Sequence, residues 1–414
     1  MDAYRAPCAY DGERFLTGGA TVLVDRGSIV AVQPGGAAVP EGWRLHEHPG
    51  ASLLPGLVDT HVHLVCDGRA GALDRVEGAT DADLQVRIHE SLGQQLAAGV
   101  TTVRDLGDRS FAVVEHRDRR PTGSLEPTVV ASGPPLTSPG GHCALLGGAV
   151  TGSAEIEAAI AERVERRVDV VKVMATGGLY SPDTDIEHLQ FTLQDLQLIV
   201  DRAHAARLPV TAHAHALGAV EQALQAGVDG IEHCTCLSTG GFGGPADLLD
   251  RIAAAAVAVS LTLGTAPGVP ASAPPPSVQD KLAAHGWTLS DALAQRAEWF
   301  ARVCASDVRL VCGSDAGIGP AKPHGILPRA VVEHTRLGMP LGRALAGATA
   351  LAADTCGLGR SKGRLRAGYD ADLLLVDGDL STDPGALLTP VRVVVGGRPA
   401  PAPARTEPGC SRPR

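Results

Sequence analysis

The stretch Leu57-Val58-Asp59-Thr60-His61-Val62-His63-Leu64 is a short apolar run with two histidines separated by one residue. Residues i and i+2 of an extended strand point to the same face, so both imidazoles can bind one metal ion. A half-buried strand with two solvated histidines has the same pattern, and it is the commoner cause of an isolated His-x-His. The other candidate ligands along the chain must therefore decide between these interpretations.

Seven further apolar runs follow, and segments with apolar residues at helical spacing lie between them. The strand candidates cover residues 57–64, 101–106, 128–132, 168–174, 209–214, 230–234, 257–263 and 308–313. The helix candidates cover residues 83–98, 153–167, 192–207, 218–226, 289–304 and 341–352, with Thr192 and Ser290 as predicted N-caps. Strands and helices in this order predict a parallel α/β fold, and eight strands favour a closed (β/α)8 TIM barrel.

Short strand patterns also occur at both ends of the chain. Residues 21–24 and 28–32 flank the turn signal Asp25-Arg26-Gly27, and residues 372–376 and 391–395 have the same character. Neither end could bury a sheet of two or three strands alone. We therefore predict that residues 1–52 and 359–400 form one small β-sandwich domain, with the barrel at residues 53–358. Residues 401–414 are predicted to be a disordered tail.

Composition argues against several functional classes. The chain has 414 residues, 44% of them hydrophobic, and a formal net charge of -10 without a basic run, which argues against a nucleic-acid partner. We find neither a secretory signal nor an apolar stretch of membrane-spanning length, so no membrane partner is expected. The nine cysteines are scattered and mostly lie in apolar runs, which favours reduced thiols in the cytoplasm.

Side chains that can bind metals lie at the ends of the predicted strands, where the chemistry of such barrels takes place. The spacing of 20 residues between His213 and His233 is about one strand-helix unit, so they should occupy equivalent positions on neighbouring strands. Each signal is modest alone, but together they are specific. The residues in chain order are His61, His63, Lys172, His213, His215, His233 and Asp315.

Lys172 is the most informative of these residues, because a lysine in an apolar strand is costly unless its charge is removed or compensated. An ion pair with a carboxylate such as Asp185 would be an ordinary solution. We favour carbamylation by carbon dioxide, because desolvation and nearby cations lower the pKa of the amine. The product is a carboxylate that is long enough to bridge two metals. Two divalent ions, the carbamate, Asp315 and a bridging hydroxide would leave one positive charge, which suits a developing oxyanion.

Together, these residues resemble the binuclear branch of the amidohydrolase superfamily. The segment 363–373, Gly-Arg-Leu-Arg-Ala-Gly-Tyr-Asp-Ala-Asp-Leu, is similar to that superfamily's return into its small β-domain. Residues 99–105, 140–142, 172–178 and 212–215 resemble the Xaa-Pro dipeptidase and carboxypeptidase-like group, which is related to imidazolonepropionases. The resemblance implies zinc-type hydrolysis of an amide bond, often beside a free carboxylate.

The resemblance also implies a ligand set. His61 and His63 would bind the more buried metal, His213 and His233 the more exposed one, and Lys172 would bridge the two. Zinc is the first expectation for such ligands, and manganese or cobalt would fit nearly as well. The predicted cofactors are therefore two divalent ions, together with carbon dioxide for the carbamate.

The remaining assignments concern proton transfer and substrate. Asp315 would ligate the first metal and move a proton from the bridging water to the leaving nitrogen. His215 lies on the same face as His213 and could replace it, but the family spacing leaves His215 to contact substrate. His142, in a glycine-rich loop, and Tyr180 are further candidate substrate contacts. A solvated loop histidine is the ordinary alternative for His142.

We therefore predict a metal-dependent hydrolase that cleaves an amide bond in a dipeptide or an N-acyl amino acid. A hydrolase of cyclic amides, of the imidazolone or hydantoin kind, is the nearest alternative. A one-metal deaminase is less favoured, because resembling deaminases need a glutamate close after the histidine at the position of His213, and none is present. A non-catalytic scaffold is less favoured, because such a protein usually loses metal ligands and none is missing here. The expected partner is a small-molecule substrate, and the sequence does not decide whether the chain forms a homo-oligomer.

Specificity is expected from the proline-rich loop 264–277, which follows the seventh strand where a lid would lie. Aromatic residues make up only 3% of the chain, which argues against a pocket built to stack on a large planar substrate.

Overall fold

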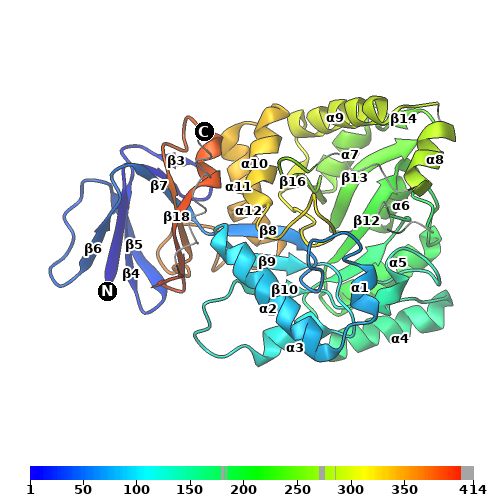
Figure 1. Ribbon diagram of the computed structural model, residues 1–414, viewed down its shortest axis with the longest axis horizontal. Helices are drawn as coiled ribbons and strands as arrows, with labels where there is room; N and C mark the ends of the chain where they lie inside the picture. The colour runs from blue at the N-terminus through cyan, green and yellow to red at the C-terminus, as the bar shows by residue number, and fades with distance from the viewer. Residues whose placement is uncertain (179–180, 182–183, 270–275, 285, 402–414) are drawn as a thin grey trace, which may run out of the picture.

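All eight predicted strands are present in the computed structural model, which describes residues 1–178, 181, 184–269, 276–284 and 286–401 (Figure 1). They form two parallel sheets with the orders β10-β9-β8 and β11-β12-β13-β15-β16, and β14 pairs antiparallel with β13. The strands are β8 (Leu57–Val62), β9 (Val100–Asp105), β10 (Thr128–Ala131), β11 (Val171–Met174), β12 (Val210–Ala216), β13 (Gly230–Ser238), β14 (Gly241–Phe242), β15 (Ala258–Ser260) and β16 (Arg309–Val311).

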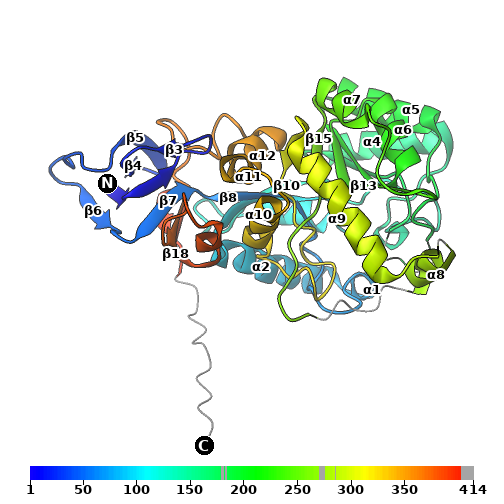
Figure 2. The ribbon, with the colours of Figure 1, turned by 90° about the horizontal axis from the view of Figure 1, so that it is seen from above.

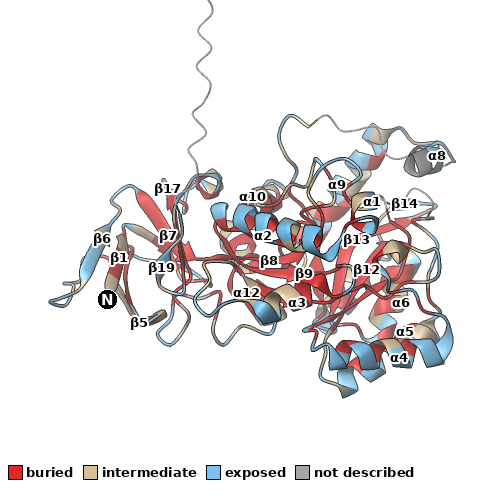
Figure 3. Cartoon of the chain, turned by 60° about the horizontal axis from the view of Figure 1, so that its bottom comes forward, coloured by how far each residue is buried: buried red, intermediate tan, exposed pale blue. Residues whose placement is uncertain are grey.

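Backbone hydrogen bonds join the two parallel sheets at both edges. Beyond β10, the Leu136 N–H donates to the Lys172 carbonyl at 2.8 Å. Beyond β16, the His63 N–H donates to the Ala316 carbonyl at 2.9 Å. The strands are buried along their length, as Figure 3 shows, because side chains pack on both of their faces.

Helices cover the outer side of these sheets, as Figure 2 shows. Their bounds are α1 (Asp74–Glu77), α2 (Asp81–Ala97), α3 (Ala112–Arg119), α4 (Gly152–Glu165), α5 (Leu193–Ala205), α6 (Leu217–Ala226), α7 (Leu248–Ala254), α8 (Pro276–Ala284), α9 (Leu289–Ala305), α10 (Leu327–Arg336), α11 (Leu341–Gly347) and α12 (Ala350–Thr355). The single helix predicted over 341–352 is wrong. It is divided between α11 and α12, because Thr349 has a ψ of -99° that interrupts the helical backbone. Among the described helices, none is both long and apolar enough to cross a lipid bilayer.

Three long helices begin with the same capping box, in which a threonine and an aspartate three residues later bond to each other's backbone N–H. The Thr192 cap of α5 confirms its prediction, and Thr80 caps α2 in the same way. The predicted Ser290 cap is wrong. Thr288 caps α9, because Asp291 stands three residues after it and accepts its backbone N–H at 2.9 Å, whereas Leu293 stands three residues after Ser290.

Two further sheets contain the strands from the chain ends, on the left of Figure 1. One has the order β5-β4-β1-β6, and the predicted hairpin at Arg26-Gly27 joins β4 to β5 with both residues at positive φ. The other has the order β19-β18-β17-β7-β2-β3, so it combines both ends of the chain. The bounds are β1 (Asp2–Ala6), β2 (Cys8–Tyr10), β3 (Phe15–Leu16), β4 (Ala20–Asp25), β5 (Ser28–Pro34), β6 (Arg44–Glu47), β7 (Ala51–Pro55), β17 (Leu373–Asp377), β18 (Pro390–Val395) and β19 (Arg398–Pro399).

Side chains from these two sheets share one hydrophobic core. Tyr4 and Val22 come from the first sheet, and Leu53, Leu373 and Val394 come from the second; all five are buried. The packing accounts for why strands from opposite ends of the chain meet here. Of the predicted tail, residues 402–414 lie outside the described residues.

Candidate active site

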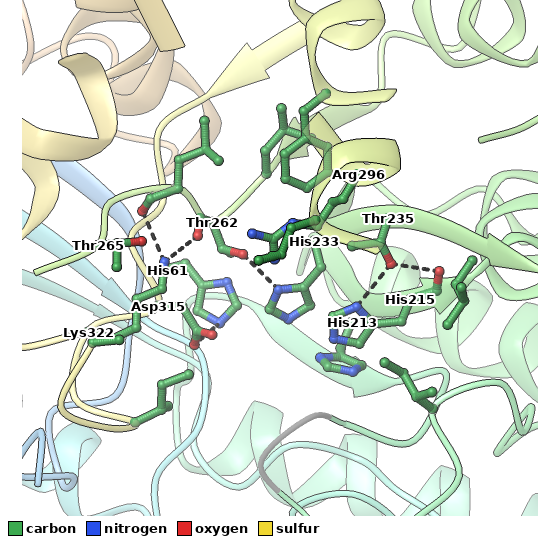
Figure 4. A pocket seen from close by; sticks show the side chains of 18 of the residues that line it. His61, His213, His215, His233, Thr235, Thr262, Thr265, Arg296, Asp315 and Lys322 are labelled. Carbon is green, nitrogen blue, oxygen red and sulfur yellow. Dashed lines mark hydrogen bonds and ion pairs between the residues drawn. The ribbon is translucent and has the colours of Figure 1, made fainter. Parts of the chain in front are cut away.

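His61, His63 and Asp315 form the first group of candidate ligands (Figure 4). The Nε2 atoms of His61 and His63 are 3.3 Å apart, and Asp315 Oδ1 lies 3.4 Å from the first and 3.2 Å from the second. Metal–nitrogen distances of about 2.0–2.1 Å in a tetrahedral site place neighbouring ligand atoms about 3.3 Å apart. The spacing of these three side chains therefore fits one bound metal ion.

His213, His215 and His233 form the second group, on the neighbouring strands β12 and β13. Their ring centroids are 4.4 to 4.7 Å apart, and all three side chains are buried. Burial is the largest cause that lowers the pKa of each ring, so each is a neutral imidazole with a lone pair for a metal. The structure thus brings together both His213, the predicted ligand, and His215, its predicted alternative.

Two of these candidate ligands have left-handed backbone conformations. The φ of His233 is 67° and that of Asp315 is 59°, values that residues other than glycine seldom adopt. Such conformations persist where the surrounding structure enforces them, and they are concentrated at functional sites. For Asp315 the constraint is visible, because its backbone N–H donates to the His61 carbonyl at 2.8 Å.

Lys172, on β11, is 1% exposed and lines the same pocket as both groups. Its Nζ atom has no hydrogen-bond partner in the part of the chain that the structure describes, so the ion pair with Asp185 is not formed. Burial lowers the pKa of Lys172 to about 8, although Glu232 and Asp315 act in the opposite direction. A buried amine without a partner, with a substantial neutral fraction near pH 8, is suited to reaction with carbon dioxide.

Glu232, on β13, is a buried residue of this site that the sequence analysis missed. It accepts hydrogen bonds from His61 Nδ1 at 2.9 Å, from Thr211 Oγ1 at 2.7 Å and from Arg104 at 3.0 Å. Burial raises the pKa of Glu232, but the neighbouring His61 and the charge of Arg104 outweigh that effect, so that the pKa falls to about 2. A glutamate within an apolar strand is as costly as Lys172, and that signal could have identified it.

His142 lies inside the site, which contradicts the alternative of a solvated loop histidine. It is buried, and its ring centroid is 4.6 Å from that of His213. One of its ring nitrogens, Nδ1, lies 2.7 Å from Ser181 Oγ, and burial lowers its pKa to about 3. Tyr180, the other predicted substrate contact, lies outside the described residues.

Both ligand groups, Lys172 and His142 line one cavity of about 470 Å³. Thr265 and Val269 also line it, so part of the proline-rich loop does face the site, while residues 270–275 lie outside the described residues. The aromatic side chains Phe242, Trp287 and Phe300 line the cavity as well. The overall aromatic content of 3% did not indicate that three aromatic side chains line this one cavity.

The chain belongs to the Amidohydrolase family, since a profile of that family matches residues 52–400. This membership confirms the resemblance seen in the sequence.

Individual relatives are more distant. The ochratoxinase of Aspergillus niger is 29% identical over 254 residues, which cover 54% of this chain and 52% of that protein. An imidazolonepropionase of Salinispora tropica is 27% identical over 246 residues, which cover 53% and 58%. The chain thus spans just over half the length of these curated relatives. A solved Xaa-Pro dipeptidase with methionine bound in its active site has the same fold, with a TM-score of 0.82 at 23% identity, covering 96% of this chain and 99% of that one.

Proposed function

We propose that this protein is a metal-dependent hydrolase of amide bonds, acting on a dipeptide or an N-acyl amino acid. The observation that supports the proposal most is the meeting of two three-residue ligand groups and an unpartnered buried lysine in one cavity. Membership of the Amidohydrolase family supports the same chemistry. The curated relatives include an ochratoxinase and an imidazolonepropionase, so a hydrolase of cyclic amides is the second candidate.

The same proposal extends to the architecture. The hydrogen bonds that join the edges of the two parallel sheets support a closed (β/α)8 barrel over residues 53–358. The shared core of the terminal sheets supports a small β-sandwich domain built from residues 1–52 and 359–400. In the described part of the chain the cysteines are free, which supports a reducing, cytoplasmic setting.

The donor set fits two divalent cations, for which zinc is the first choice and manganese or cobalt the alternatives. His61, His63 and Asp315 would hold one ion, His213 and His233 the other, and a carbamate on Lys172 would bridge them. The chemistry supplied by such ions, when bound, is polarisation of the scissile carbonyl and a lowered pKa, near about 7, for a water molecule.

Asp315 is the group that we propose moves the proton. Burial raises the pKa of its carboxyl, but the neighbouring His61 and His63 outweigh that effect and hold the pKa well below its usual range. The side chain is therefore a carboxylate at neutral pH, which can accept a proton from water and donate it to the leaving nitrogen. His142 and His215, both neutral and buried, would orient the substrate beside this carboxylate.

A substrate screen on the full chain, loaded with zinc in the presence of bicarbonate, tests the proposal. Dipeptides, N-acyl amino acids, cyclic imides and aminated nucleobases would be compared by amine or ammonia release. Hydrolysis of a dipeptide or an N-acyl amino acid as the fastest reaction is expected. Faster hydrolysis of a cyclic imide would favour the second candidate, and faster ammonia release from a nucleobase would overturn both. A protein that holds far less than two metals per chain would contradict the binuclear site.

A further inference from the structure

One wall of the cavity is apolar and partly open to solvent. It consists of β14, the segment before α9 and one face of α9, which contribute Phe242, Trp287, Leu289, Leu293 and Phe300 to the lining. The rings of Phe242 and Trp287 stack with centroids 6.1 Å apart. Leu293 is 41% exposed, so this apolar surface can be reached from the solvent. An accessible apolar wall inside a cavity with polar groups is typical of a ligand-binding site.

Arg296 lies on the same face of α9, because it stands three residues after Leu293 and four before Phe300. Its guanidinium lies over the Phe300 ring, 5.6 Å from the centroid, and it lines the cavity. Figure 4 shows this side chain extending from α9 toward His233. Arg296 therefore places a permanent positive charge between the histidines and the apolar wall.

Lys322 supplies a second cation in the same cavity. Its Nζ atom donates to the carbonyls of Thr262, at 2.5 Å, and Leu263, at 3.3 Å, which fixes it beside the histidines. Apart from the candidate ligands, the charged groups that line the cavity in the described part of the chain are Arg296, Lys322 and Glu333. Two cations and one carboxylate leave this part of the lining with a net positive charge.

We propose that the substrate is an amide that carries both a carboxylate and a bulky apolar group, an inference that rests on the hydrolase function proposed above. The carboxylate would lie against Arg296, within the positive field to which Lys322 contributes, and the apolar group would pack on Phe242, Trp287 and Leu293. A guanidinium matches a carboxylate with two parallel hydrogen bonds, and the Phe300 ring beneath it reduces its contact with water. A small neutral amide would use neither feature.

Matched substrates separate the two parts of this proposal. The first would be N-benzoyl-leucyl-leucine with a free carboxylate, the second the same compound as its C-terminal carboxamide, and the third N-acetyl-leucyl-leucine. We expect the free acid with the benzoyl group to have the highest kcat/KM. Equal values for all three compounds would overturn the proposal.

The variant Arg296→Met removes the charge and keeps much of the apolar stem. We expect kcat/KM for the free acid to fall about 100-fold, as loss of a charge-assisted pair does, and that for the carboxamide to change less than about threefold. Arg302→Met is the matched control, because Arg302 also lies on α9 over an aromatic ring, that of Trp299 at 5.1 Å, and does not line the cavity. Equal losses on both substrates, or none on the acid, would contradict a role in carboxylate binding.

Binding without turnover distinguishes failure of this inference from failure of the hydrolase function. Isothermal calorimetry with N-benzoyl-leucine should show binding to the zinc-loaded chain that is at least about tenfold weaker in Arg296→Met and in Leu293→Asp. Val164→Asp is the control for the second variant, since Val164 is 45% exposed on α4 and does not line the cavity. Binding with this pattern but no hydrolysis would support the pocket and refute the hydrolase. No binding to the unaltered chain would refute the pocket.

Discussion

The Nδ1 atom of His61 lies 2.9 Å from a carboxylate oxygen of Glu232, although the two residues are 171 positions apart in the chain. The second oxygen of this carboxylate accepts from Arg104 and Thr211, so Glu232 is fixed from two further strands. A carboxylate that accepts a hydrogen bond from Nδ1–H holds the imidazole in one tautomer, with the Nε2 lone pair directed at a metal. That Nε2 atom is the one that faces His63 and Asp315.

Replacing Glu232 should therefore weaken metal binding without removing a ligand. We expect Glu232→Gln to lower the affinity for zinc by about 10- to 100-fold, the usual effect of losing a partner of a ligating histidine. Competition with a fluorescent chelator measures the affinity directly. Glu90→Gln on the exposed side of α2 is the control, and an affinity equal to that of the control would refute the positioning role.

Lys172 is expected to act as a carbamate rather than as an amine. Lys172→Ala should therefore lower kcat by at least about 100-fold, because it removes a ligand that both ions would share. Added acetate or propionate should restore part of the activity, since a small carboxylate can occupy the space of the carbamate. Lys172→Arg should not be active, because a guanidinium keeps its charge and does not react with carbon dioxide.

A spectroscopic measurement checks the same point without turnover. After incubation with 13C-bicarbonate and zinc, the unaltered chain should show a carbamate carbon signal in the 13C NMR spectrum that is missing from Lys172→Ala. Identical spectra, or full activity of Lys172→Ala, would exclude the carbamate.

The sequence predicted the parts of this protein that depend on local pattern. Apolar runs located all eight parallel strands, and His213 could be related to His233 because the ends of neighbouring parallel strands lie at one edge. The meeting of strands from both chain ends was predictable because neither end could bury a sheet of two or three strands alone. These inferences depend on the spacing of apolar residues, which can be read from short segments of the sequence.

Contacts between distant segments were harder to predict. Glu232 was missed because its partners, His61 and Arg104, belong to strands far away in the sequence. The enclosure of His142 depends on how its loop packs against β12, which no local pattern indicates. The aromatic wall was missed for the same reason, since the overall aromatic content does not reveal that Phe242, Trp287 and Phe300 meet around one cavity.

His334, on α10, should make the folded state sensitive to acid. It is fully buried, its Nδ1–H donates to the Ala330 carbonyl at 2.7 Å, and burial lowers its pKa from 6.5 to about 4. The unfolded chain takes up this proton near pH 6.5 and the folded chain only near pH 4. The contribution of His334 to the free energy of unfolding should therefore be constant above pH 6.5 and fall by about 1.4 kcal/mol per pH unit below it, until pH 4 is reached.

The variant His334→Gln isolates this contribution, because it keeps a polar side chain that does not titrate. Between pH 7 and pH 5 the unaltered chain should lose about 2 kcal/mol more than His334→Gln does. Urea unfolding at both pH values, with a chelator present so that metal binding does not contribute, gives the comparison. If the unaltered chain and His334→Gln show the same pH dependence, the pKa of His334 does not differ between the folded and the unfolded state, and the prediction is wrong.

The start of α9 offers a direct comparison between the cap that the sequence indicated and the cap that the structure has. Thr288 Oγ1 accepts the Asp291 N–H at 3.2 Å, whereas the side chain of Ser290 lies within the first turn. Thr288→Ala should destabilise this end of the helix by about 1 kcal/mol, and Ser290→Ala should be neutral or slightly stabilising, because alanine is the better helix former. Hydrogen exchange of the amides of residues 289–292 should accelerate about fivefold in Thr288→Ala alone. Faster exchange in Ser290→Ala instead would show that Ser290 is the N-cap of α9, as the sequence indicated. Because Leu289 and Ala292 line the cavity, that result would also change which residues hold the apolar wall in place.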